Sequence, residues 1–510
     1  MTDVPPPSPS ASSLNPSPKD QLVLPLEEFA RHESGAIPRK ERVFVNRHLK
    51  MAGISWIGFD MDYTLAIYNQ AAMDELSIVA TVQKLIDRGY PEFIREVKHA
   101  TDFPVRGLLI DKRFGHVLKM DRYKYVGKGY HGFSELSKEQ LRELYHAKKI
   151  RPATPRYHWI DTLYALSEVA LYAALVDSHE RHGLAVDYAK LFSDIRDAID
   201  EAHRDGTILD AIMADLPKYV MKDPQLAPTL HKWRSAGKKL FLLTNSRWSY
   251  SDKMMNYLLG GVMPEYPSWR NFFDIVICAA RKPAFFQEKN PLLERDGEKV
   301  RPAKFPLERG KIYEGGNLQD LERALEVAGD EVLYVGDHIY GDILRSKKES
   351  AWRTAMIMQE LETEVMAHEE CQTDLEFTEQ LEETRDRLED DLRFYQARFK
   401  EVARQAEGQT NGVAAELLAE RTRLKRAVDR IRARLRTVDA EVNLVERRTA
   451  TRFHPYWGSL LKEGTEQSIF GQQVEDYACV YTSRVSNFRF YSPQQTFRSP
   501  RDEMAHEIGV

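Results

Sequence analysis

The stretch Ile57–Tyr68, IGFDMDYTLAIY, joins a short apolar run to two aspartates that are separated by one methionine. A continuous apolar run of this kind is typical of a strand that is buried on both faces of a parallel sheet. Asp60 and Asp62 follow the run directly, so two carboxylates stand close enough to repel each other. The stretch therefore predicts a buried strand whose carboxyl end carries a functional site.

Three further apolar runs share this pattern: Lys238–Leu243 before TNS, Asp274–Ala279 before ARKP, and Glu331–Val335 before GDHIYGD. Helical patterns separate the runs, and this alternation is typical of a parallel sheet with crossover helices. In such sheets, ligands bind beyond the carboxyl ends of the strands. We therefore predict an α/β fold in which the four polar clusters meet at one edge of the sheet.

These clusters contain the groups that phosphate transfer through a carboxylate needs. An aspartate can attack phosphorus and form an aspartyl phosphate, but two like unit charges about 4 Å apart repel by roughly 4 kcal/mol at an effective dielectric near 20. Asp337 and Asp342 could hold Mg²⁺ together with Asp60, because Mg²⁺ prefers a few carboxylates, water and phosphate oxygens. Lys282 offers a fixed cation.

The remaining groups fit the same reaction. Thr244 and Asn245 offer a hydroxyl and an amide to phosphate oxygens, just before an expected helix start that favours an anion. Asp60 would attack phosphorus, while Asp62 would protonate the leaving oxygen and later deprotonate water. Each cluster alone has a structural alternative as a turn, a helix cap or a solvent-facing residue. Four clusters in this order, each after a strand, favour the catalytic interpretation.

The spacing of the strands predicts the domain organisation. Residues 39–68 and 236–358 carry the four strands and form the expected catalytic core. Residues 69–235 far exceed one crossover connection and contain helical patterns, so we expect a large, mainly helical cap inserted after the first catalytic strand. Residues 1–38 are a Pro/Ser-rich tail and lead-in that we expect to be disordered, and residues 451–510 should return to the core or form a subunit contact.

Residues 359–450 have a different composition. An acidic first half and an Arg-rich second half carry apolar residues at heptad spacing, with EGQTNG (Glu407–Gly412) as a turn between them. This pattern predicts an antiparallel coiled-coil helical hairpin whose helices satisfy each other's charges. A binding arm for acidic partners or nucleic acid is the alternative. The predicted seam includes Leu381, Leu388, Tyr395 and Val402 in the first helix and Leu424, Ile431 and Val438 in the second.

Composition excludes several classes of protein. The 510 residues carry a net charge of -5 and a pI of about 6.4, so bulk charge favours neither nucleic acid nor an anionic membrane. Three cysteines without metal-ligand spacing fit a reducing compartment. No apolar run is long enough to cross a bilayer, and the N-terminus lacks the features of a secretory signal. We expect a cytoplasmic protein with no nucleic-acid or membrane partner.

Several long stretches resemble one known family. The order of the motifs is similar to that of the haloacid dehalogenase (HAD) superfamily of phosphohydrolases, and more closely to the cytosolic purine 5′-nucleotidase family within it. The resemblance covers roughly residues 39 to 360 and 458 to 493. The stretches that carry it are FDMDYTLAIY, RGLLIDKRFGHVLKMD, HGF, LLTNSRWSYSDKMMNYL, ARKPAFF, YVGDHIYGDILRSKKESAWRT and GSLLKEGTEQSIFGQQVEDYACVY.

The resemblance implies a Rossmann-like HAD core with a cap. It also implies Mg²⁺-dependent hydrolysis of nucleoside 5′-monophosphates, typically 6-hydroxypurine nucleotides such as IMP or GMP, together with phosphate transfer to a nucleoside, effector regulation and a homo-oligomer. Carried over by position, Asp60 is the nucleophile and Asp62 the acid/base, with its backbone carbonyl on the metal. Asp337 is a metal ligand that Asp342 supports. The phosphate-binding positions are Thr244 and Lys282.

The cap positions are matched less completely. Phe133 of HGF matches the residue that stacks on the base, Arg196 and Asp200 match residues that recognise the purine, and His203 matches another nucleotide contact. A core aromatic is the alternative for Phe133, and a surface ion pair is the alternative for the i, i+4 pair Arg196 and Asp200. The chain departs from the family at Ser134, Arg204 and Leu209, where the family has Asn, Tyr and Lys.

These departures remove polar partners that discriminate substrates. The choice of nucleotide is therefore open, and an HAD phosphatase for another small phosphate ester is an alternative. A second alternative is a coiled-coil interaction or scaffold protein with a vestigial HAD core. The intact Asp60, Asp62, Lys282 and Asp337 favour the enzyme, whereas the long hairpin favours a role in partner binding or oligomerisation.

Overall fold

The computed structural model describes residues 37–97, 100–146, 150–344, 349–406 and 412–500. Nearly all of the tail expected at residues 1–38, and of the turn expected at 407–412, lies outside these ranges. The contacts of the chain place Arg39–Val510 in one compact unit. Among the described residues, no helix combines the length and the apolar composition that crossing a membrane requires.

A ten-stranded sheet forms the core, in the order β1-β20-β17-β16-β3-β11-β12-β15-β13-β14. The strands from β20 to β15 in this order are parallel, whereas the flanking pairs β1–β20, β15–β13 and β13–β14 are antiparallel. The predicted α/β fold with a parallel sheet is confirmed. The strands are β1 (Phe44–Val45), β3 (Trp56–Phe59), β11 (Lys239–Leu243), β12 (Ile275–Cys278), β13 (Leu292–Asp296), β14 (Lys299–Pro302), β15 (Ile312–Gly315), β16 (Val332–Gly336), β17 (Arg353–Ile357) and β20 (Val480–Thr482).

The four strands that the sequence predicts are neighbours at the centre of this sheet. Phe59 of β3 pairs with Val335 of β16 on one side and with Leu242 of β11 on the other. Leu243 of β11 pairs in turn with Ile277 of β12. Because the strands are parallel and in register, their carboxyl ends meet at one edge of the sheet.

Both faces of the central strands are buried, because alternate residues enter different apolar clusters. Leu240 and Leu242 belong to one cluster, and Phe241 and Leu243 belong to the other. Gly58 is required between β3 and β11, since a Cβ atom there would lie 2.1 Å from the Phe241 ring. The helices between the core strands are α8 (Leu226–Ser235), α9 (Trp248–Leu259), α10 (Ala284–Gln287) and α11 (Leu318–Leu325).

The segment between β3 and β11 contains the predicted helices and also a sheet that was not predicted. This second sheet is antiparallel, with five strands in the order β8-β7-β6-β5-β9. Its strands are β5 (Leu108–Asp111), β6 (His116–Met120), β7 (Val126–His131), β8 (Ser134–Glu135) and β9 (Tyr157–Ile160). The helices are α2 (Gln70–Asp87), α3 (Lys138–Leu141), α4 (Leu166–Arg181), α5 (Tyr188–Arg204), α6 (Thr207–Ala214) and α7 (Leu216–Tyr219), and β4 (Ile67–Tyr68) pairs with β10 (Val220–Met221).

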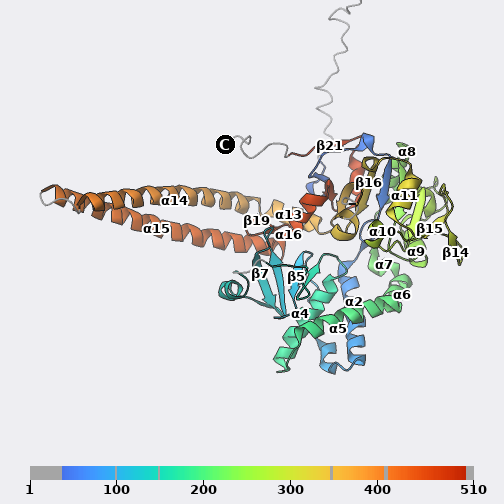
Figure 1. The fold of residues 1–510 in the computed structure, drawn as a ribbon, viewed down its shortest axis with the longest axis horizontal. Coiled ribbons are helices and arrows are strands. Elements are labelled where there is room, and N and C mark those ends of the chain that lie inside the picture. Colours follow the sequence, from blue (N-terminus) through green and yellow to red (C-terminus); the bar gives the residue numbers. More distant parts are fainter. Residues whose placement is uncertain (1–36, 98–99, 147–149, 345–348, 407–411, 501–510) are drawn as a thin grey trace, which may run out of the picture. The chain divides into compact units, whose positions relative to one another are not determined.

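Two long helices follow the core, α14 (Gln372–Ala406) and α15 (Gly412–Phe453), after the shorter α13 (Leu361–Glu370). They lie side by side (Figure 1) and bury an apolar cluster that includes Leu381, Leu388 and Val438 of the predicted seam. Arg398 of α14 also donates to Glu420 of α15 at 3.0 Å. The structure therefore has the two predicted helices in contact, while their coiled-coil geometry stays a prediction.

The C-terminal residues pair with the N-terminal strands of the same unit. β20 joins the ten-stranded sheet between β17 and β1, and β21 (Thr496–Phe497) pairs with β2 (Leu49–Lys50). The other elements are η1 (Arg39–Glu41), η2 (Met51–Gly53), η3 (Glu92–Glu96), η4 (Arg142–His146), η5 (Trp269–Phe272), η6 (Gly329–Glu331), η7 (Ile339–Leu344), β18 (Lys462–Glu463), β19 (Glu466–Gln467), α16 (Ile469–Tyr477) and η8 (Val485–Phe490).

Candidate active site

Asp60 lies at the carboxyl end of β3, where its position is fixed by the neighbouring strand. Its backbone N–H donates to the Val335 carbonyl at 2.9 Å, and its side chain is nearly buried. Oδ1 accepts from the Met61 N–H at 2.7 Å and lies 2.9 Å from the ammonium of Lys282. Oδ2 has no hydrogen bond to any residue that the structure describes. One oxygen is therefore anchored, and the other is available to react.

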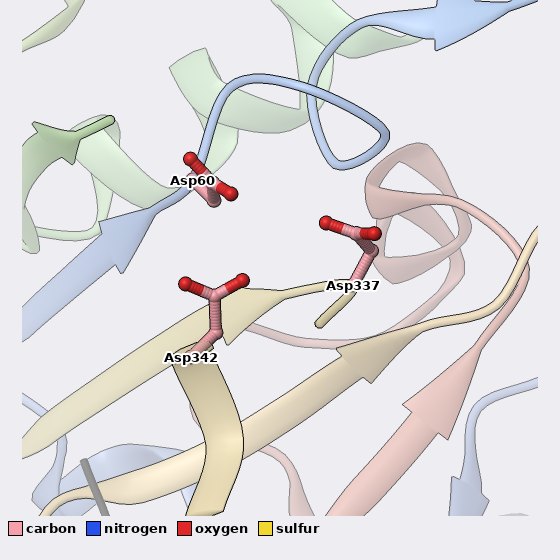
Figure 2. Close-up of side chains that lie close together, drawn as sticks. All are labelled: Asp60, Asp337 and Asp342. Carbon is pink, nitrogen blue, oxygen red and sulfur yellow. The ribbon is translucent and has the colours of Figure 1, made fainter. Parts of the chain in front are cut away.

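Asp60, Asp337 and Asp342 form an acidic cluster. Asp337 follows β16 directly, and Asp342 lies in the short helix η7. One carboxylate oxygen from each side chain lies within 4.8 Å of the other two, and Figure 2 shows the three groups turned toward a common space. Three hard oxygen donors at this spacing fit Mg²⁺, which takes few carboxylates and keeps water and phosphate oxygens as its other ligands.

Lys282 places the positive charge beside this cluster. Its buried ammonium lies 2.6 Å from Asp342 Oδ1 and donates to the Tyr334 hydroxyl at 3.0 Å. Asn245 holds the Lys282 backbone from both sides: its Oδ1 accepts the Lys282 N–H at 2.5 Å, and its Nδ2 donates to the Lys282 carbonyl at 3.0 Å. The loops that follow β11 and β12 are thereby tied together.

The electrostatics of the cluster favour a further cation. Burial raises the pKa of Asp60 well above its usual range, and Lys282 only partly opposes this effect. Burial, with the Asp342 carboxylate, raises the pKa of Asp337 to about 7. Burial acts against the charge of Lys282, but Asp342 and Asp60 hold its pKa well above the ordinary value. Three carboxylates against one ammonium leave a negative site that a divalent cation would neutralise.

Asp62 has a different environment from Asp60. Its Oδ1 accepts from the Tyr68 hydroxyl at 2.5 Å and its Oδ2 from the Ser246 hydroxyl at 2.6 Å, so its side chain is not part of the acidic cluster. Tyr68 in turn lies 2.8 Å from the hydroxyl of Tyr250. Burial raises the pKa of Asp62, whereas the bonds from Ser246 and Tyr68 oppose the shift.

Tyr68, Ser246 and Tyr250 were not predicted. Two of them had a signal, because Tyr68 ends the stretch that carries the two aspartates and Ser246 ends the TNS motif. Thr244, at the start of that motif, is fully buried. Its Oγ1 accepts the Ser246 N–H at 3.1 Å, and its backbone N–H donates to Ile277 at 3.0 Å. Thr244 therefore lies at the end of β11, in the loop that presents Ser246 to Asp62.

Arg106 is a further residue of the site that sequence reasoning did not assign. It is fully buried and donates through Nη1 to the Asp337 backbone carbonyl at 2.8 Å. Its Nε and Nη2 each donate to the Glu360 carboxylate at 2.7 Å. Arg106 thus fixes the backbone of Asp337, the predicted metal ligand. It lies in the RGLLID stretch, where the neighbouring sequence does not indicate Asp337 or Glu360 as its partner.

The predicted substrate residues do not contact the acidic cluster. The half-buried Phe133 packs edge-on against Phe103, with ring centroids 5.2 Å apart. Arg196 of α5 lies 2.7 Å from His158 Nε2, and its Nε lies 3.7 Å from Glu168 Oε2. Within the described residues it forms no ion pair with the exposed Asp200, so the alternative of a surface pair is wrong.

His203, also on α5, connects the insertion to the catalytic loop. Its ring lies edge-on to Tyr164 at 6.0 Å, and Tyr164 lies edge-on to Tyr63 at 4.8 Å. Tyr63 is the residue between Asp62 and Thr64. A second connection joins Asp161, which follows β9, to the loop after β16: Asp161 Oδ2 lies 3.2 Å from His338 Nε2. The α5 side of the insertion therefore lies beside the carboxyl edge of the core sheet.

Comparisons with known proteins agree with this architecture. A model described as the 5′ nucleotidase family matches residues 43–509. A 5′-nucleotidase domain-containing protein of Dictyostelium discoideum is 29% identical over 474 residues, which cover 91% of this chain and 75% of that protein. The human 5′-nucleotidase domain-containing protein 2 is 34% identical over 337 residues, which cover 63% of this chain and 64% of that protein.

Among solved structures, a predicted phosphoglycolate phosphatase from Haemophilus somnus 129PT aligns with 60% of this chain and 87% of its own length, at 12% identity and a TM-score of 0.27. This likeness is too low to support an argument about function. The family match, in contrast, covers nearly the whole chain. The protein is an enzyme of the 5′ nucleotidase family.

Proposed function

We propose that this enzyme hydrolyses nucleoside 5′-monophosphates, with a preference for purine nucleotides, through an aspartyl-phosphate intermediate and with Mg²⁺ as cofactor. The observation that carries the proposal is the geometry at Asp60. One of its oxygens is anchored by Met61 and Lys282, the other is available, and two more carboxylates lie within 4.8 Å.

The metal ligands would be Asp60, Asp337 and Asp342, with the Asp62 backbone carbonyl that the family motif implies. When bound, Mg²⁺ supplies positive charge that offsets the repulsion between the carboxylate and the phosphate. Lys282 contributes a second positive charge 2.9 Å from the nucleophilic side chain. The Asn245 side chain keeps Lys282 in place through hydrogen bonds to both the N–H and the carbonyl of the Lys282 backbone. The chain itself therefore supplies orientation and part of the charge compensation.

Asp62 is proposed to carry the proton. It would give the proton to the leaving 5′-oxygen and take one from the water that attacks the phosphoenzyme. Tyr68 and Ser246 each donate to one of its oxygens and so fix the direction of the carboxyl group. Burial raises the pKa of Asp62, which favours the protonated form that the first step needs.

We propose that the nucleoside is recognised by residues of α5 and of the turn between β7 and β8. Phe133 would stack on the base, Arg196 and Asp200 would bond its edge, and His203 would contact the nucleotide near Tyr164. His158 supports this proposal, because it accepts from Arg196 and holds the guanidinium in one orientation. Burial lowers the pKa of His158 to about 4, so the ring is a neutral acceptor at pH 7.

A phosphate-release screen tests the proposal. We expect Mg²⁺-dependent release from IMP and GMP, a smaller release from pyrimidine monophosphates, and no release after Asp60→Asn. Asp330→Asn, at an exposed position of η6, is the matched control and should keep the wild-type rate. Full activity of the Asp60→Asn enzyme would show that Asp60 is not the nucleophile.

A second candidate is the hydrolysis of another small phosphate ester. It is favoured by Ser134 and Leu209, where the related family has an amide and a lysine. The same screen separates the two candidates if it includes sugar phosphates. A kcat/KM that is higher for a sugar phosphate than for every nucleotide would identify that ester, and not a nucleotide, as the preferred substrate. Addition of a nucleoside to the assay, followed by chromatography, tests whether phosphate is also transferred to an acceptor other than water.

A further inference from the structure

A cavity of about 770 Å³ opens where α13, the start of α14 and the end of α15 meet the β18–β19 hairpin. None of the proposed catalytic or substrate residues lines it. Apolar side chains such as Val365 and Leu375 form part of its wall. Its charged lining is mostly acidic, with three basic side chains, Arg39, Lys128 and Lys462, against six carboxylates: Glu364, Glu376, Glu379, Glu382, Glu446 and Glu463.

Four of the six carboxylates already have partners. Glu376 accepts from the Gln372 side chain at 2.8 Å, and Glu382 lies 3.8 Å from Arg385. Glu463 lies 3.2 Å from the buried ammonium of Lys119, and Glu364 accepts from the Ser459 hydroxyl and from the Leu460 N–H. Glu379 and Glu446, in contrast, form no ion pair with any residue that the structure describes. Burial raises the pKa of Glu446 and the nearby Glu382 carboxylate raises it further, while Lys138 and Arg385 act in the opposite direction. The lining therefore contains two carboxyl groups, Glu379 and Glu446, that no described basic side chain pairs with.

Two uncharged polar atoms of the lining also lack partners. Thr449 is 7% exposed, and its Oγ1 is buried without a hydrogen bond. The Nδ1 atom of His368 is likewise buried without a partner, and burial lowers the pKa of this histidine, so its ring is neutral at pH 7. Buried polar atoms without partners are rare in folded proteins, and each costs free energy until a ligand or water satisfies it. Both residues line the same cavity as the free carboxylates.

We propose that this cavity binds a linear polyamine such as spermidine. Each ammonium group offers hydrogen-bond donors and no acceptor, which suits Thr449 Oγ1, His368 Nδ1 and the carboxylates of Glu379 and Glu446. The methylene segments between the ammonium groups match the apolar wall. A phosphate-bearing ligand would meet repulsion from the acidic lining, and Mg²⁺ would make no use of the apolar side chains.

Calorimetric titration of the full chain with spermidine tests this site. We expect saturable binding of one spermidine per chain. Thr449→Val and Glu379→Gln should each weaken binding by roughly three- to tenfold, because each removes one acceptor. Thr437→Val and Glu389→Gln are matched controls on α15 and α14 outside the cavity, and they should bind like the wild type. Circular dichroism confirms that each variant is folded.

Three results would overturn the proposal: no saturable binding, equal affinity for Thr449→Val, Glu379→Gln and the wild type, or displacement of spermidine by Mg²⁺ at matched ionic strength. The Asp60→Asn enzyme should bind spermidine as the wild type does, because the cavity shares no residue with the catalytic cluster. Failure of the proposed nucleotidase activity and failure of polyamine binding are therefore separate outcomes.

Discussion

Asp60 and Asp62 lie two positions apart in the chain, but their carboxylates have different partners. Asp60 lies beside an ammonium and two carboxylates, whereas Asp62 accepts from two hydroxyl groups. This difference gives a physical basis for assigning attack on phosphorus to one and proton transfer to the other. The sequence predicted the two aspartates, because a strand that ends in adjacent carboxylates is unusual. It did not predict Tyr68 and Tyr250 as a pair, because 182 residues separate them.

Asp74 provides a prediction for a single buried residue. It lies on α2, is 3% exposed and accepts from Gln70 at 2.9 Å. Burial raises the pKa of Asp74 to about 7, so between about pH 4 and pH 7 the folded state binds a proton that the unfolded state releases. The wild type should therefore lose stability as the pH rises through this window.

Asp74→Asn should remove that loss. We expect the free energy of unfolding of the variant, relative to the wild type, to rise by roughly 3 kcal/mol between pH 4.5 and pH 8. Urea denaturation at several pH values measures the difference, and Asp330→Asn is the exposed control. A difference that stays constant with pH would show that Asp74 is ionised in the folded protein throughout.

The loop after β16 depends on an element of the insertion. Arg106, just before β5, bonds both the Asp337 carbonyl and the Glu360 carboxylate that precedes α13. Replacing Arg106 with Met leaves the Glu360 carboxylate, which is 27% exposed, without its ion-pair partner, and losing charged hydrogen bonds at such a partly buried pair costs roughly 2–3 kcal/mol. We expect a loss of this size in chemical denaturation, together with a higher Mg²⁺ concentration at half-maximal activity.

The double variant Arg106→Met/Glu360→Leu separates the effect of the ion pair with Glu360 from the effect of the hydrogen bond to the Asp337 carbonyl. It should recover most of the stability, because no charge is left without a partner. It should not recover the Mg²⁺ response, because the bond to the Asp337 carbonyl is still absent. A double variant no more stable than Arg106→Met would contradict this account of the ion pair.

At the scale of elements, the central parallel strands were predicted and the second sheet was not. The core runs are apolar and continuous, so their burial on both faces is visible in the sequence. Strands β5 and β6 are short, and their turn at 112–115 places Gly115 at a φ of +70°. This hairpin signal was present in LLIDKRFGHVLKM, but the helical patterns that follow it suggested a mainly helical insertion. The bond from Arg106 to Glu360 spans 254 residues and has no local signal.

For the whole molecule, the hairpin of α14 and α15 is the part whose role the catalytic site does not explain. The apolar cluster of Leu381, Leu388, Val438 and Val442 lies near its base, and Arg398 bonds Glu420 farther along. Exposed apolar residues on these helices, including Phe394 and Leu444, suit contact with another chain. We propose that the hairpin contributes to a homo-oligomer rather than to catalysis.

A shortened hairpin tests this proposal. Replacing residues 392–427 by a four-residue Gly/Ser linker keeps the apolar cluster at the base. We expect phosphate release per chain to stay within about twofold of the wild type. The number of chains per particle, measured by light scattering, should fall. An unchanged oligomeric mass would show that the outer hairpin makes no subunit contact, and a loss of activity would show that it supports the site.

The central claim is that Asp60 accepts the phosphoryl group. The most direct measurement is an acid quench of the enzyme during turnover of a purine monophosphate with Mg²⁺, followed by mass spectrometry of its peptides. We predict a phosphorylated peptide that contains Asp60 in the wild type, and neither this peptide nor phosphate release in the Asp60→Asn enzyme. Phosphate on another residue, or wild-type turnover by Asp60→Asn, would contradict the account.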